Sequence, residues 1–352
     1  MNTSPKKATK ILDSCYKSKT TAFLIGGTGI GKSEIVKTFA KNKAKELGLK
    51  FSQDCIAPND SQFGYIDFRL SLMESIDLGG LPIVNDDGTQ SQAFLPNLPT
   101  SGQGILFLDE FAQANMSVMA IAGQLLHEKR IGEYIMPEGW TVICAGNRAS
   151  DRAGSIAIPS HAIGRVVMIN VDVSTQDWLD HAQSIGVHEN VLGFIGFQHH
   201  YLNNFDPKVK DAQASPRSWV RLSDLLNTDP VPEIIQDLSA GCIGEQATIE
   251  FMNFMSLKND VPDLREIVAG KDVAIPDQGG IMYATICALI SAIKQAGDST
   301  DEWFDNAMAY INRFPSPEYG IFFVKTLSTA VPEIVNTKTY GDFKVANQDL
   351  EF

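Results

Sequence analysis

The sequence predicts an α/β domain with a mostly parallel sheet, followed by a helical C-terminal half. Three observations lead to this fold class. Short apolar runs alternate with helical stretches over residues 1–172, a pattern typical of a parallel sheet covered by helices on both faces. A glycine-rich segment separates the first run from the first long helical stretch after it. After about residue 173 the strand patterns stop and helix-start signals take their place.

The strands and helices of the first part can be assigned in order. The run TAFLI (21–25) is apolar and leads into glycines, which predicts a buried strand that enters a loop. Apolar residues recur at helical spacing over 32–47, so we expect a helix that Gly48 ends. A second helix is expected over 112–128. Three further apolar runs are short and rich in β-branched residues, and each predicts a strand: GILFL (104–108), TVICA (141–145) and VVMINV (166–171).

Two other regions depart from this alternation. Glycines, prolines and the turn NDDG fill residues 65–100, which predicts an insertion in the sheet domain that carries a hairpin. The C-terminal half has a Pro-, Asp- and Gly-rich break near 260–280. The expected domains are therefore a sheet domain over 1–172, a helical lid over 173–260 and a helical extension over 261–352. Good helix-capping residues begin the helices of this half: Ser174, Ser215 with Pro216, Ser299 with Glu302, and Ser316 with Pro317.

Composition excludes several classes of protein. The 352 residues are 44% hydrophobic and 20% charged, unlike disordered, collagen-like or disulfide-scaffold chains. The N-terminus lacks an apolar signal region, and the longest apolar stretch (281–293) is shorter than the roughly 20 residues of a membrane span. The five cysteines are far apart, which indicates neither a zinc site nor a disulfide framework. We expect a cytoplasmic protein without a membrane partner.

The charge is unevenly distributed. A net charge of −13 weighs against sequence-independent nucleic-acid binding, which needs lysines and arginines to neutralise phosphates. Residues 1–50 nevertheless carry a net +8, against −21 for the remainder. One interpretation is a solvated basic face on the N-terminal helices. The other is head-to-tail assembly of copies through complementary surfaces.

The segment GGTGIGKS fits the phosphate-loop pattern G-x-x-x-x-G-K-[ST], between a predicted strand and a predicted helix. Glycines let backbone N–H groups curl around phosphate oxygens. The lysine brings a positive charge to the β and γ phosphates, and the final serine can bind Mg²⁺ at the positive end of the helix. The candidate nucleotide-binding residues are Gly26, Gly27, Thr28, Gly29, Ile30, Gly31, Lys32 and Ser33.

Polar residues follow two later strands. Asp109 and Glu110 end the apolar run ILFL, and Asn147 follows TVICAG. The carboxyl edge of a parallel sheet is where ligands of such folds bind. We therefore expect Asp109 to hold Mg²⁺ together with Ser33, Glu110 to polarise the attacking water, and Asn147 to orient that water near the γ-phosphate.

The phosphate loop, the acidic pair after ILFL and the asparagine after TVICAG, in this order, resemble the AAA+ ATPases. Four longer motifs sharpen the resemblance to the MoxR family: ESIDLGGLP (74–82), EKRIGEYIMPEGW (128–140), AGNRASDRAGSIAIPSHAIGR (145–165) and SPRSW (215–219). The resemblance covers about residues 23–226. It implies a helix-2-type insertion, a helical lid, and ATP sites between neighbouring subunits of a ring, most often of six. It also implies chaperone-like maturation of a protein client, often with a partner that has a von Willebrand factor A domain.

The resemblance assigns roles to further residues. Asn147 matches sensor 1, Arg217 matches sensor 2, and Arg165 matches the arginine finger. Arg217 also falls in the first turn of a predicted helix, from which a long side chain can reach a phosphate. The family commonly has Asn-Arg-Phe at the finger, whereas this chain has Gly-Arg-Val. Arg148 and Arg152 therefore remain alternative fingers.

The expected activity is hydrolysis of Mg·ATP that drives remodelling of a protein client. One alternative is a nucleic-acid-associated motor, which the acidic composition disfavours. Another is a nucleotide-gated assembly module with little turnover. GTP in place of ATP is also compatible with the phosphate loop.

Overall fold

The computed structural model describes residues 2–94, 97–148, 164, 166–206 and 208–347. The chain divides into two compact units, Met1–Ser174 and Thr175–Phe352. All strands among the described residues lie in the first unit, and the second unit is helical. The change from α/β to helical structure therefore falls where the strand patterns of the sequence stop.

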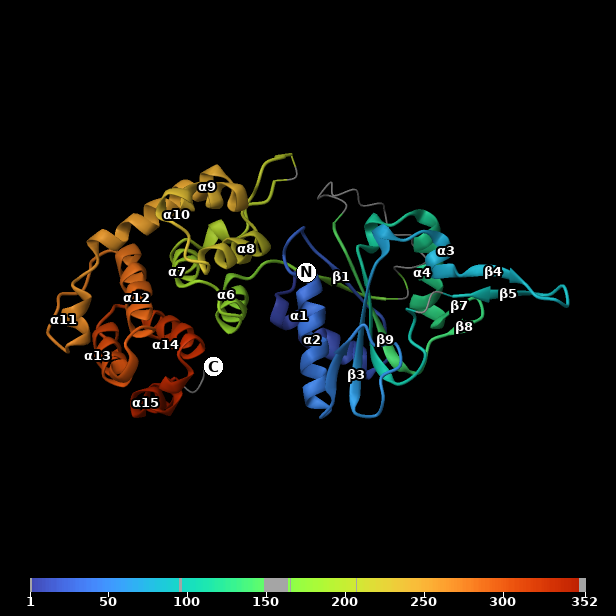
Figure 1. Ribbon diagram of the computed structural model, residues 1–352, viewed down its shortest axis with the longest axis horizontal. Helices are drawn as coiled ribbons and strands as arrows, with labels where there is room; N and C mark the ends of the chain where they lie inside the picture. Colours follow the sequence, from blue (N-terminus) through green and yellow to red (C-terminus); the bar gives the residue numbers. More distant parts are fainter. Residues whose placement is uncertain (1, 95–96, 149–163, 165, 207, 348–352) are drawn as a thin grey trace. The chain divides into compact units, whose positions relative to one another are not determined.

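The first unit is built on a six-stranded sheet in which every pairing is parallel. The strand order is β10-β1-β9-β6-β3-β2, and the strands can be followed in Figure 1. This order places β9 between β1 and β6. The carboxyl ends of these three strands are therefore neighbours. The strands are β1 (Ala22–Ile25), β2 (Lys50–Gln53), β3 (Gln62–Arg69), β6 (Gln103–Asp109), β9 (Gly139–Gly146) and β10 (Val167–Asn170).

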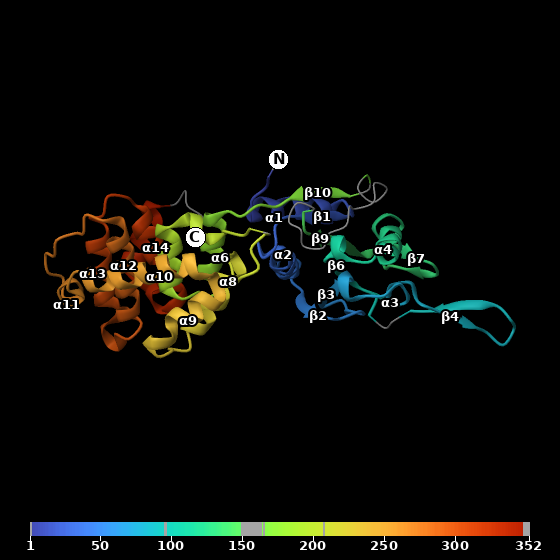
Figure 2. The same ribbon diagram turned by 90° about the horizontal axis from the view of Figure 1, so that it is seen from above.

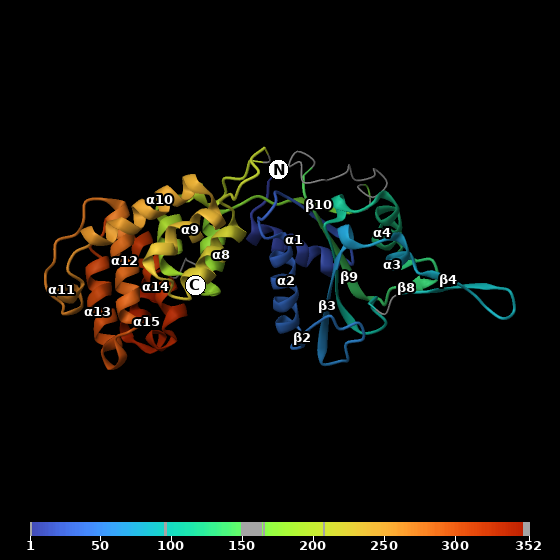
Figure 3. The same ribbon diagram turned by 45° about the horizontal axis from the view of Figure 1, so that its top comes forward.

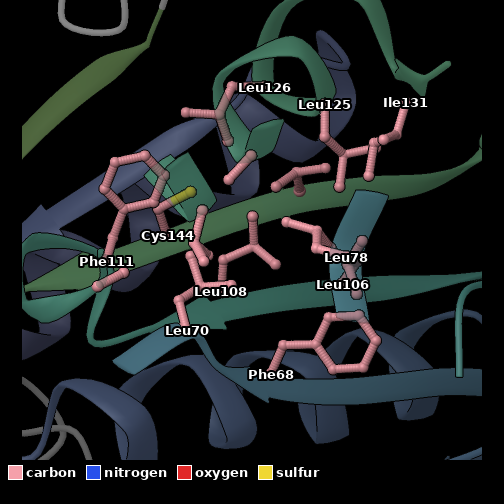
Figure 4. Packing of buried hydrophobic residues seen from close by; sticks show 14 of the residues in the cluster. Phe68, Leu70, Leu78, Leu106, Leu108, Phe111, Leu125, Leu126, Ile131 and Cys144 are labelled. Atoms are coloured by element: carbon pink, nitrogen blue, oxygen red, sulfur yellow. The ribbon is translucent and has the colours of Figure 1, made fainter. Parts of the chain in front are cut away.

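Helices cover both faces of this sheet (Figure 2). On one face, α1 (Pro5–Lys17) and α2 (Lys32–Glu46) pack on residues such as Phe107 and Ile143. On the other face, α3 (Ser75–Gly79) and α4 (Met116–Glu128) pack on residues such as Leu106 and Cys144. Figure 4 shows this second core, where Leu78 of α3 and Leu125 of α4 approach Leu106 and Leu108 of β6. Alternate residues of each strand thus enter different cores.

The predicted strands are confirmed, each with shifted ends. The helix expected from residue 112 begins only at Met116, because a 3₁₀ turn, η2 (Phe111–Gln113), comes first and Asn115 takes the N-cap position. Ser215 and Ser299 take the N-cap positions of helices in the second unit, although only the Ser215 side chain makes a capping hydrogen bond. The start predicted at Ser316 is shifted, because Pro317 takes the N-cap position of the helix that begins at Glu318. The sequence did not predict β2 or β3. Residues 65–69 of the segment expected as an insertion belong to β3, a strand of the main sheet.

Two hairpins project from the sheet domain, and they contain the remaining strands, β4 (Leu81–Val84), β5 (Gln90–Ala93), β7 (Arg130–Ile131) and β8 (Tyr134–Ile135). The β4–β5 hairpin confirms the predicted turn at NDDG. The two hairpins lie beside each other (Figure 1), and the backbone N–H of Gln92 lies 3.5 Å from Oε2 of Glu133. All four residues of β4 are exposed, and Ile135 of β8 is 72% exposed.

Helices α6 to α15 make up the second unit (Figure 3). The α12 helix packs against α7, and Lys294, just after α12, pairs with the buried Glu189 of α7 at 3.3 Å. Asp180 of α6 pairs with Lys325 of α14 at 3.2 Å. These pairs join residues of the proposed lid to residues of the proposed extension. The helices are α6 (Thr175–Ser184), α7 (Glu189–Phe197), α8 (Pro216–Leu226), α9 (Pro232–Ile243), α10 (Glu245–Ser256), α11 (Leu264–Val268), α12 (Gly279–Ile293), α13 (Thr300–Ile311), α14 (Glu318–Ala330) and α15 (Lys338–Ala346).

The acidic excess belongs to the second unit. Residues 1–174 contain 17 basic and 17 acidic residues, whereas residues 175–352 contain 12 basic and 25 acidic residues. The net charge of −13 is thus carried by the helical unit alone. Within the part of the chain that the structure describes, no helix has the length and apolar character needed to cross a membrane.

Close packing of the central strands sets a testable limit on side-chain size. Gly64 of β3 pairs with Gly104 of β6, which pairs with Trp140 of β9. A Cβ added at Gly104 would lie 2.2 Å from the backbone oxygen of Gly64, which cannot move without breaking the sheet. We predict that Gly104→Ala lowers the free energy of unfolding by roughly 1 to 3 kcal/mol, measured by calorimetry.

Gly241→Ala is the matched control. Gly241 lies in α9, where an added Cβ would meet nothing within 4 Å. Alanine there should raise the free energy of unfolding by about 0.5 to 1 kcal/mol, because it restricts the unfolded chain and favours helix. Equal effects of the two substitutions would contradict the packing argument.

Candidate functional site

The phosphate loop lies between β1 and α2, as its sequence predicts. Gly29 and Gly31 have φ values of 75° and 91°, which favour glycine over any residue with a side chain. A Cβ at Gly26 would lie 2.7 Å from the backbone oxygen of Val171, so this glycine lets β1 pass close to the end of β10. The α2 helix then begins at Lys32 with Gly31 as N-cap, so no side chain caps its first N–H groups.

Lys32 is buried at 8% exposure, and its ammonium group joins three segments of the chain. The Nζ atom donates hydrogen bonds to the backbone oxygens of Gly26 at 2.9 Å and Gly27 at 2.8 Å. It also donates to Oδ1 of Asn147 at 2.8 Å. A buried ammonium group requires such acceptors. The lysine of the loop and the asparagine after β9, predicted separately, are therefore in direct contact.

Asp109, the last residue of β6, contacts the start of α2. The hydroxyl of Ser33 donates to Oδ2 of Asp109 at 2.5 Å. The other carboxylate oxygen, Oδ1, accepts the backbone N–H of Glu110 at 2.8 Å. The two residues predicted to hold a metal ion thus lie within hydrogen-bonding distance of each other, 76 positions apart in the sequence.

Glu110 occupies an unusual backbone position. Its φ of 55° and ψ of 34° lie in the left-handed region, at the turn from β6 into η2. Its Oε2 atom accepts a hydrogen bond from the hydroxyl of Ser71, which lies in the 3₁₀ turn η1 (Leu70–Leu72) directly after β3. Left-handed residues other than glycine are uncommon and often occur at functional sites. Ser71 had no motif to mark it in the sequence.

The site can hold a phosphate group and a divalent cation. The Oγ1 atom of Thr28 is buried and has no hydrogen-bond partner among the described residues, which fits a group that a phosphate oxygen would satisfy. Over those residues, no three His, Cys, Asp or Glu side chains form a complete metal site. One hydroxyl from Ser33 and one carboxylate from Asp109 suit Mg²⁺, which keeps several waters and binds phosphate oxygens.

Asp67 is a second residue that the sequence analysis missed. It lies on β3, and its Oδ1 atom is buried without a hydrogen-bond partner in the described part of the chain. Burial and the nearby carboxylate of Asp109 raise the pKa of Asp67 to about 6, and the Arg69 guanidinium partly offsets them. An aspartate within a β strand carries no recognisable signal, so only the fold brings Asp67 to this edge of the sheet.

Two of the four predicted arginines lie among the described residues, and two do not. Arg217 is exposed in the first turn of α8, whose N-cap Ser215 accepts the N–H of Ser218 at 3.2 Å. It belongs to the second unit. The Nη2 atom of Arg148 donates to the backbone oxygen of Val171 at 3.1 Å, within its own sheet domain. Arg165 and Arg152 lie outside the described residues.

The strand order, the loop after β1, the acidic end of β6 and the asparagine after β9 together form the α/β P-loop core of the AAA+ fold, followed by a helical region. No protein-family model matches the sequence, and no curated protein matches it.

Similar solved structures were found at low identity. A candidate ATPase from Cytophaga hutchinsonii is 15% identical, with 69% of this chain and 82% of the other covered and a TM-score of 0.35. A RuvB variant from Thermotoga maritima is 14% identical, with 86% of each chain covered and a TM-score of 0.39. NtrX from Brucella abortus is 11% identical, with 96% and 67% covered and a TM-score of 0.32. The fold assignment depends on the strand order and the loop, not on these similarities.

The hydrogen bond between Ser71 and Glu110 yields a prediction. The hydroxyl holds one carboxylate oxygen of Glu110 and leaves the other to accept a proton. With Glu110 in the water-activating role that the sequence predicts, we expect Ser71→Ala to lower nucleotide hydrolysis about ten-fold, part of the 10²–10⁴ that a positioned general base contributes, with nucleotide affinity within two-fold of wild type. Ser71→Thr keeps the hydroxyl and should retain most of the turnover. Equal turnover in the alanine variant and wild type would show that Ser71 does not position Glu110.

Proposed function

We propose that this protein is a MoxR-type AAA+ ATPase that hydrolyses Mg·ATP and uses the energy to remodel or mature a protein client. One observation supports the hydrolysis above all others. Hydrogen bonds join Lys32 to Asn147 and Ser33 to Asp109 at one edge of the sheet. These are the phosphate-binding, water-orienting and metal-binding residues that ATP hydrolysis requires.

Each residue has a role in the proposed reaction. Lys32 exchanges the backbone oxygens of Gly26 and Gly27 for oxygens of the β and γ phosphates. Ser33 and Asp109 hold Mg²⁺, which when bound neutralises negative charge on the phosphate oxygens. Asn147 orients the attacking water. Glu110 takes up a proton of that water as its oxygen bonds to the γ-phosphorus, while the bond from this phosphorus to the β–γ bridging oxygen breaks and ADP leaves with the electron pair.

The arginines complete the proposed site. Arg217, at the start of α8, contacts the nucleotide as sensor 2. Arg165 acts on the nucleotide of a neighbouring subunit, with Arg152 and Arg148 as alternatives. Arg148 is the weakest of the three, because it is already bonded to Val171 and lies 3.8 Å from Asp172. Sites shared in this way require an assembly in which neighbouring copies contact head to tail, as a ring or a spiral, and we propose one of six subunits.

A protein client fits the surface of the sheet domain. The β4–β5 and β7–β8 hairpins expose Leu81, Ile83, Val84 and Ile135, and exposed apolar side chains that lie close together commonly mark contacts with other proteins. A partner with a von Willebrand factor A domain is part of the proposal, as is a cytoplasmic location. Nucleic acid is the less favoured partner because of the acidic composition.

Two substitutions separate binding from hydrolysis. Lys32→Ala should abolish ATP binding in calorimetry, because it removes the positive charge of the phosphate loop. Glu110→Gln should bind ATP like wild type and turn it over about 10²- to 10⁴-fold more slowly. The same turnover assay with GTP identifies the preferred base. If both variants bound ATP like wild type, the site would be wrongly assigned. Because the Glu110→Gln variant should hold ATP without hydrolysing it, proteins that co-purify with its ATP-bound form are the candidates for the client.

Mixing tests whether each site is shared. Arg165→Ala should bind ATP and hydrolyse it about 10³- to 10⁵-fold more slowly, the range measured for arginine fingers. Lys32→Ala is inactive for a different reason. In mixed assemblies whose subunits exchange, some interfaces pair an intact loop with an intact finger, so turnover should partly recover. Wild-type turnover by Arg165→Ala alone would move the finger to Arg152 or Arg148.

A further inference from the structure

One face of the sheet changes from apolar to charged at its carboxyl edge. On β3, Phe63 and Tyr65 pack in the core beneath α2, and the alternation of the strand places Asp67 and Arg69 on that same face. On β6, Phe107 enters the same core and Asp109 follows two residues later. The two strands pair in parallel, with Arg69 opposite Asp109 and Asp67 opposite Phe107.

This register fixes how far Asp67 is from the proposed metal ligand. Neighbouring strands are about 4.8 Å apart, and two residues along a strand span about 6.6 Å. The backbones of Asp67 and Asp109 are therefore about 8 Å apart on one face of the sheet. Both side chains stand on one face of the sheet, and a bound water between their carboxylates can span such a separation.

The surroundings of Asp67 leave one of its oxygens without a donor. Oδ1 is buried and unpartnered within the described part of the chain. Arg69 and Lys37 both favour the charged carboxylate from a distance, and no hydrogen bond from either reaches it among the described residues. Lys37 lies one turn after Ser33 on α2, the helix that covers this face of the sheet. A buried carboxylate oxygen without a donor is costly, and each such group calls for an explanation.

We propose that Asp67 is a positioning residue of the nucleotide site: its Oδ1 accepts a hydrogen bond from a water bound to the Mg²⁺ ion that Ser33 and Asp109 hold. The inference rests on the proposed function, because it needs that ion. Mg²⁺ gives up its waters reluctantly and retains several of them in protein sites. Groups that hydrogen-bond to metal ligands fix their orientation, and loss of such a group typically lowers metal affinity or activity 10- to 100-fold.

The proposal separates the role of Asp67 in metal binding from any role in folding. A purely structural aspartate would stabilise the domain, so its replacement would lower the melting temperature. An aspartate whose role is to bind the hydrated ion destabilises the ion-free protein, because its oxygen lacks a partner and a like charge lies nearby. Asp67→Asn removes the charge at nearly constant shape. It should leave the melting temperature of the nucleotide-free protein unchanged or higher.

The test measures binding of a fluorescent, non-hydrolysable ATP analogue by anisotropy, once with MgCl₂ and once with EDTA. For wild type, Mg²⁺ should tighten binding. For Asp67→Asn, we expect the gain from Mg²⁺ to shrink about ten-fold or more, while the affinity in EDTA stays within two-fold of wild type. A titration of Mn²⁺ into the analogue complex, followed by loss of the free-ion EPR signal, should show the same weakening.

Asp54→Asn is the matched control. Asp54 is exposed just after β2, lines the same open pocket as Asp67, and has a φ of 56° that asparagine also adopts. Its charge raises the pKa of Asp67 less than that of Asp109 does, so the variant should stay close to wild type in every measurement. An Asp67→Asn variant that keeps the full gain from Mg²⁺, or that loses affinity equally with and without Mg²⁺, overturns the inference and leaves the proposed function intact. A wild-type protein that binds no nucleotide under either condition overturns the proposed function itself.

Discussion

The buried ammonium group of Lys32 is the interaction on which the candidate site depends. A charge of this kind is tolerated away from water only when several acceptors surround it. Here the acceptors come from the loop after β1 and from the residue after β9, so one group fixes the loop against a strand 115 positions away in the sequence. In the proposed function, phosphate oxygens replace the backbone oxygens, so the ammonium group exchanges partners and does not have to be desolvated again. Much of the free-energy cost of burying this charge is therefore met by the fold itself.

The sheet then determines what can approach that ammonium group. β9 lies between β1 and β6 in the sheet, so Asn147 follows the strand that neighbours both the strand leading into the phosphate loop and the strand ending at Asp109. Alternation along the strands places apolar residues over most of one face and charged residues only at its last positions, as on β3 from Phe63 to Arg69. The alternation of side chains along each strand therefore places apolar residues in the core beneath α2 and carboxylates on the same face at the carboxyl edge of the sheet. No separate scaffold is needed for the site.

The sequence predicted those parts of the fold and site that have strong local patterns. Continuous apolar runs identified β1, β6, β9 and β10, and the glycine spacing identified the loop. The β3 strand was not predicted, because QFGYIDFR mixes polar residues with a glycine. Close packing requires that glycine, since a Cβ at Gly64 would lie 2.5 Å from the Trp140 ring. Ser71 and Asp67 escaped for a different reason. Glu110, which accepts from Ser71, and Asp109, which lies near Asp67, are about 40 positions later in the sequence, and only the pairing of β3 with β6 brings them close.

The β4–β5 hairpin has a consequence for local stability. A two-stranded ribbon in water is marginal by itself, and this one buries none of the four side chains of β4. Its backbone hydrogen bonds should therefore open far more often than those of β6 or β9, whose amides lie in the centre of the sheet. Amide exchange would be expected to divide the domain accordingly, with a slow sheet and a fast ribbon. A ligand of the ribbon would then act mainly by slowing its opening, and the signal of binding would be a gain in local order with little change in the sheet.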